Sequence, residues 1–104
     1  AALQAFSTAT LRAARWAIQN PEAAILISQK VLPDVAKDEI VAGVRAFAKS
    51  QYYNVDGILR KEAWDYTVDE LLKGGEIKQR LNYNDHVVTE FAQAAVTKLG
   101  PFKR

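Results

Sequence analysis

The chain has 104 residues, enough for one domain with a modest hydrophobic core. Its 14 basic and 12 acidic residues are interspersed, which argues against a nucleic-acid partner, and no apolar run approaches the roughly 20 residues that a membrane-spanning helix needs. The absence of cysteine excludes disulfides, thiol nucleophiles and thiolate metal sites. Because the chain lacks an initiating Met and opens on a helical pattern, we interpret it as an excerpt of a longer protein.

The first predicted helix covers residues 1–19 and ends at a corner formed by Asn20 and Pro21. Proline disfavours a helical residue before it and fits the first position of a new helix, for which Asn20 is the expected N-cap. Arg12 and Arg15 are expected on the solvent side. The expected buried stripe follows spacings of three and four residues and comprises Leu3, Phe6, Thr10, Ala13 and Ala17, with Leu11, Ala14 and Ile18 beside them.

The second predicted helix, residues 21–31, carries few charges and is expected to be mostly buried. A third helix should span residues 37–51, with acidic residues in its first turn as the helix dipole favours. Gly43 lies in its middle, at a cost of about 1 kcal/mol relative to Ala. A close helix crossing at Gly43 would explain the glycine.

Residues 51–59 are predicted to form a loop, and a fourth helix covers residues 61–73. Gly74 and Gly75 end that helix, since one of them can adopt the left-handed cap conformation. Residues 76–81 should be extended, and a last helix is expected over residues 85–99. No segment shows a strand pattern, so the fold class is all-α, with about five helices in a single helical segment over residues 1–104.

Residues able to carry catalysis are scarce. The single histidine, His86, cannot form a metal site alone, and no serine has a histidine close in sequence. Asp65, Asp69 and Glu70 resemble a carboxylate pair but are better explained as a solvated helix face. We therefore expect no enzymatic activity, no metal and no cofactor.

The aromatic residues permit two interpretations. Tyr52, Tyr53 and Tyr83 fit either the wall of a small-molecule pocket or the edge of a hydrophobic core. For Trp16 and Trp64, on helices with apolar stripes, core packing is the favoured interpretation.

Several segments, in order and spacing, resemble the C-terminal stretch of periplasmic solute-binding proteins of the nitrate, sulfonate and taurine group, which serve ABC importers. The corner at Asn20 and Pro21 and the exit after Gly75 are part of this resemblance. The segments that carry it are Ala5-Phe6, residues 10–24, Asp56-Gly57, Glu62-Ala63-Trp64, residues 67–72, residues 75–78 and Tyr83-Asn84-Asp85.

The resemblance implies the C-terminal helical part of one lobe of a longer α/β protein with two lobes. Such a receptor binds a small anionic or heterocyclic solute in the periplasm or at the cell surface and delivers it to a membrane permease. The partners would be the solute, the permease and the remainder of the same receptor, with no nucleic acid. Tyr52, Tyr53 and Asn54 are the candidate ligand contacts, because their loop is aromatic, polar and between helices. The alternative function is a stand-alone helical protein-interaction module.

Overall fold

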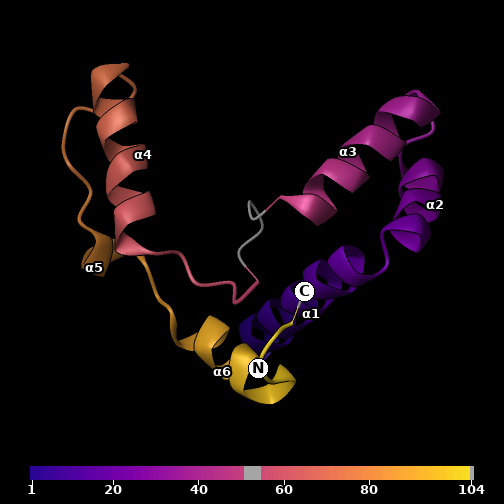
Figure 1. Cartoon of the computed structure of the whole chain (residues 1–104). Coiled ribbons are helices and arrows are strands. Elements are labelled where there is room, and N and C mark those ends of the chain that lie inside the picture. Colours follow the sequence, from indigo (N-terminus) through magenta and orange to yellow (C-terminus); the bar gives the residue numbers. More distant parts are fainter. Residues whose placement is uncertain (51–54, 104) are drawn as a thin grey trace.

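The computed structural model describes residues 1–50 and 55–103. Within these residues the regular structure is helical, without strands, which confirms the all-α prediction. The helices are α1 (Ala2–Gln19), α2 (Pro21–Val31), α3 (Lys37–Lys49), α4 (Lys61–Lys73), α5 (Tyr83–His86) and α6 (Glu90–Leu99) (Figure 1).

The corner between α1 and α2 forms where the sequence predicts it, at Asn20. The role of the Asn20 side chain differs from the expectation: its amide Nδ2 donates a hydrogen bond to the carbonyl oxygen of Trp16 at 2.9 Å, and it makes no cap bond to α2. The backbone N–H of Asn20 donates to the same carbonyl at 2.8 Å. Asn20 therefore closes the end of α1, while Pro21 begins α2 without needing a capping bond at its own nitrogen.

Two helix boundaries differ from the prediction. Helix α3 ends at Lys49 rather than residue 51, because Ser50 has an extended backbone with ψ 149°. The predicted last helix is divided into α5 and α6, with Val87 extended at φ −114° and ψ 123°. Val87, Val88 and Thr89 are three consecutive β-branched residues, which lose χ1 freedom in a helix, and the break falls at this run.

The helices do not pack around one centre: α4 and α5 form a pair that stands apart from α1, α2, α3 and α6. Helix α1 packs mainly against α6 and less extensively against α2 and α3, α2 packs against α3, and α4 contacts only α5 among the described helices (Figure 1). The radius of gyration is 16.5 Å, whereas a compact chain of this length has about 13 Å. The buried apolar residues are correspondingly few: Leu11, Ala24, Ile25, Ile40, Val68 and Ala95.

The apolar spacing predicts the buried face of α1 only in part: Leu11 is buried as expected, and Ala14, Ala17 and Ile18 are half-buried, whereas Thr10 and Ala13 are exposed. Leu3 and Phe6 are 65% and 71% exposed, and the residues that α1 buries are Thr8, Leu11 and Arg15. The reason is the position of α6, which lies on the side of α1 that carries long polar side chains able to reach backbone carbonyls. The large apolar side chains near the start of α1 consequently face outward.

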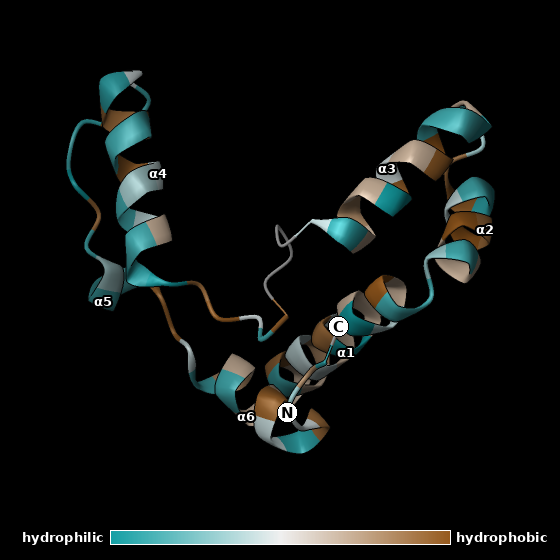
Figure 2. Cartoon of the chain, viewed as in Figure 1, coloured by the Kyte–Doolittle hydropathy of each residue, from teal (hydrophilic) through white to brown (hydrophobic). Residues whose placement is uncertain are grey.

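Helix α2 also departs from its predicted burial. Only Ala24 and Ile25 are buried, while Leu26, Ile27 and Val31 are exposed. Figure 2 shows hydrophobic residues, in brown, in the middle of α2. Gly43 is exposed, and a Cβ added to it would meet nothing within 4 Å, so the predicted close helix crossing is wrong.

Candidate ligand-binding site

Arg15 joins three parts of the chain that are distant in sequence. Its Nε donates to the carbonyl oxygen of Val55 at 2.9 Å, and its Nη1 donates to that of Gly100 at 2.7 Å. The guanidinium carbon lies 5.5 Å from the centroid of the Phe102 ring, within the range of a cation–π contact. With 8% of its surface exposed, Arg15 is a buried cation held by carbonyl dipoles and an aromatic ring.

The same face of α1 is fixed to α6 by further contacts. Gln4 Nε2 donates to the Phe91 carbonyl oxygen at 3.0 Å and to Thr8 Oγ1 at 3.2 Å. Gly57, at φ +70°, lies close to Leu11 and to α6: an added Cβ would stand 3.9 Å from Leu11 Cδ1 and 3.7 Å from a side-chain atom of α6. The segment that begins at Val55 is thereby held against both helices.

A pocket opens beside Arg15, between the C-terminal half of α1 and residues 99–103; we call it the α1–tail pocket. Its volume is about 430 Å³, and Gln19 and Leu99 contribute to its wall. The residues that give it chemical character are two arginines, a lysine and two aromatic side chains: Arg12, Arg15, Lys103, Trp16 and Phe102.

Sequence reasoning placed Arg15 on the solvent side, and the structure corrects this. A signal for its burial was present, because Gln4, Thr8, Leu11 and Arg15 also follow spacings of four and three residues and so share a helix face. From the sequence alone, the apolar stripe that begins at Leu3 is an equally good candidate for the buried face of the helix. Arg12, by contrast, is exposed as expected.

The candidate ligand contacts Tyr52, Tyr53 and Asn54 lie outside the described residues. The next residue, Val55, is the one whose carbonyl oxygen accepts a hydrogen bond from Arg15, so the described chain is held to α1 from this residue on. The third loop tyrosine, Tyr83, is at the start of α5, where its hydroxyl donates to the Leu59 carbonyl oxygen at 2.6 Å.

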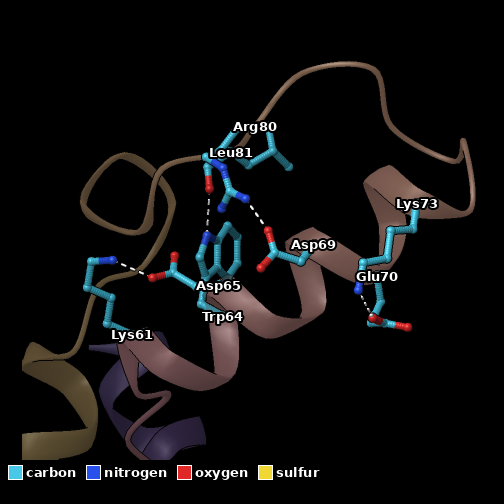
Figure 3. A network of polar contacts seen from close by, with 8 residues as sticks. All are labelled: Lys61, Trp64, Asp65, Asp69, Glu70, Lys73, Arg80 and Leu81. Atoms are coloured by element: carbon cyan, nitrogen blue, oxygen red, sulfur yellow. Dashed lines mark hydrogen bonds and ion pairs between the residues drawn. The ribbon is translucent and has the colours of Figure 1, made fainter.

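The acidic face of α4 consists of ion pairs. Figure 3 shows the carboxylates facing cations along the helix and across to the following segment: Asp65 with Lys61, Asp69 with Arg80, and Glu70 with Lys73. All three pairs are solvent-exposed, as the interpretation of a solvated face expects.

Trp64 and His86 connect α4 to α5. The indole Nε1 of Trp64 donates to the Leu81 carbonyl oxygen at 2.7 Å (Figure 3). The His86 ring stacks on the indole with centroids 5.7 Å apart, and its Nδ1 lies 2.9 Å from the Asn82 carbonyl oxygen. Trp64 is half-buried, so it packs at the edge of this small unit.

The described residues contain no cluster of three or more His, Asp or Glu side chains placed to hold a metal ion. Within residues 1–50 and 55–103, no helix has both the length and the apolar character to cross a membrane. Comparison with known protein families, characterised proteins and solved structures finds no match.

Proposed function

We propose that this chain is the C-terminal helical part of one lobe of a solute-binding protein that serves an ABC importer. Its role is binding, not catalysis, in the periplasm or at the cell surface. The observation that carries the proposal is the large apolar side chains that α1 and α2 leave exposed, together with the sequence resemblance described above. They are Leu3 and Phe6 on α1 and Leu26, Ile27 and Val31 on α2.

Apolar side chains that are this large and this exposed are stabilised when another surface covers them. Full burial of a Leu, Ile or Phe side chain contributes roughly 1.5–3 kcal/mol, so covering the exposed part of each contributes about 1–2 kcal/mol. In a two-lobed receptor, helices of this kind cover a β-sheet, and the sheet would belong to the remainder of the same protein. The expanded dimensions of the chain support the same proposal, because helices such as α4 and α5 that do not join a common core are expected where a shared layer is provided elsewhere.

In this proposal the loop at residues 52–54 supplies ligand contacts, and the two lobes close around the solute by a hinge motion. The solute is a small anion or heterocycle, such as nitrate, taurine, another sulfonate, a thiamine precursor or an aromatic acid. The permease receives it from the closed receptor.

The decisive experiment identifies the reading frame that encodes the chain and measures the mass of the mature protein. We expect coding sequence for an export signal and alternating strands and helices before Ala1. A thermal-shift screen of that complete protein against the solutes named above should give a stabilising ligand. A reading frame that starts at Ala1 would overturn the receptor proposal and favour the helical interaction module instead.

The ligand contacts have a separate test in the complete protein. Tyr52→Ala and Tyr53→Ala should weaken solute binding in calorimetry. Tyr66→Ala is the matched control, because Tyr66 is an exposed tyrosine on α4. Unchanged affinity in both loop variants would refute the assignment of the loop while leaving the receptor proposal in place.

A further inference from the structure

We propose that the α1–tail pocket binds a small organic anion, with its charged group held by Arg12, Arg15 and Lys103 and its apolar part against Trp16 and Phe102. This site goes beyond the function proposed above, since it involves neither residues 52–54 nor a second lobe. It is formed by described residues of this chain alone.

The first argument is charge. Helix α1 contains no Asp or Glu, and none of the described residues that line the pocket is acidic. Arg12 and Lys103 form no ion pair with any described residue. Three cations therefore line the pocket with no anionic side chain among its described residues, although every acidic residue of α4 beyond its first turn has a cation as partner. A bound oxyanion would relieve the mutual repulsion of the three cations.

The second argument is the way Arg15 is held. Its Nε and Nη1 are occupied by the Val55 and Gly100 carbonyls, and Phe102 lies over its face. Nη2 makes no hydrogen bond to a described residue. Every fully buried side-chain nitrogen and oxygen of the described chain has a hydrogen-bond partner, so Nη2 is not fully buried and solvent can reach it. The guanidinium is fixed in place with one donor nitrogen available, which lowers the entropic cost of binding an anion.

The third argument is the aromatic character of the wall. Trp16 is 40% exposed, a large fraction for an indole on a packed helix, and Phe102 is half-buried. A volume of about 430 Å³ falls within the usual range for small-molecule pockets, which combine apolar walls with a few polar groups. Aromatic side chains beside cations favour an anion with a ring over a bare inorganic ion.

The test uses the 104-residue chain and three probes: benzoate, benzyl alcohol and inorganic phosphate. Binding is followed by the NMR signal of the Trp16 indole N–H, with Trp64→Phe used to assign the two indoles. We expect saturable binding of benzoate and weaker binding of the other two probes, which lack the charge or the ring. Arg12→Gln and Lys103→Gln should each weaken benzoate binding on the order of fivefold, the effect of one exposed charge contact.

Lys78→Gln is the matched control, because Lys78 is an exposed lysine outside the pocket with no ion pair to a described residue. Its affinity for benzoate should equal that of the unmodified chain. The variants at Arg12 and Lys103 keep the test informative even if changes at the buried Arg15 unfold the chain, and circular dichroism checks their folding. Non-saturable binding, equal loss in the control, or phosphate binding as tight as benzoate would each overturn the proposal. These outcomes are independent of the receptor proposal, which depends on different residues and on the complete protein.

Discussion

Replacing Arg15 by Met should lower the free energy of unfolding by about 3 kcal/mol. Arg15 makes two hydrogen bonds to carbonyls, those of Val55 and Gly100. Hydrogen bonds to charged groups contribute roughly 1.5–3 kcal/mol each, and the lower value applies because both acceptor residues are half-buried. Met retains much of the apolar packing of the arginine stem, so the loss reports mainly on the guanidinium.

The measurement is urea unfolding followed by circular dichroism, with the Arg15 variant compared with Arg12→Met. Arg12 lies one turn earlier on the same helix but is exposed, and its substitution should change the free energy of unfolding by less than about 0.5 kcal/mol. Amide hydrogen exchange should also accelerate around Val55 and Gly100 in the Arg15 variant alone. If the two variants are equally stable, the reasoning that Arg15 joins the three segments is wrong.

Three further substitutions test local conclusions by the same unfolding measurement. Gly43→Ala should stabilise the chain by about 0.5–1 kcal/mol, because the position is helical, exposed and open to a methyl group; destabilisation would indicate a hidden contact. Gly75→Ala should destabilise the chain by about 1–2 kcal/mol. The added methyl group meets no other atom, so the cost is the backbone strain of an alanine at φ +73°. An unchanged stability would argue against the left-handed cap. Trp64→Phe should destabilise the chain by about 1 kcal/mol, because the hydrogen bond to the Leu81 carbonyl oxygen is lost. It should also change the stacking of the His86 ring, which is visible as a shift of the ring NMR signals. A variant as stable as the unmodified chain would contradict this expectation.

Local sequence signals predicted the ends of several helices correctly. Pro21 set the boundary between α1 and α2, and Gly74 and Gly75 set the end of α4, with Gly75 in the left-handed conformation that the sequence predicts. These signals act within a few residues, through the fixed φ of proline and the missing Cβ of glycine, so they can be read without knowledge of the fold. The break at Val87 was missed because its β-branched run lies within an otherwise helical pattern.

The burial of individual side chains could not be predicted in the same way, because it depends on which face of a helix packs against another helix. On α1 two sets of residues have helical spacing. Leu3 and Phe6, from the predicted apolar stripe, are exposed, whereas Arg15 is buried together with Leu11, the one residue of that stripe that is fully buried. Nothing local to α1 reveals that the carbonyl of Gly100 would be within reach of Arg15. The α1–tail pocket was missed for the same reason, since its cations come from opposite ends of the chain.

The pairing of α1 with α6 also has a consequence during protein synthesis. Arg15 and its acceptor Gly100 are separated by 85 positions, so at 5–20 residues per second a ribosome needs about 4–17 s to supply the second after the first. The α2–α3 hairpin is local and can form within that interval. Until translation reaches the tail, however, α1 is without its helical partner and is open to chaperones, and a ribosome that stalls before Gly100 would leave it so.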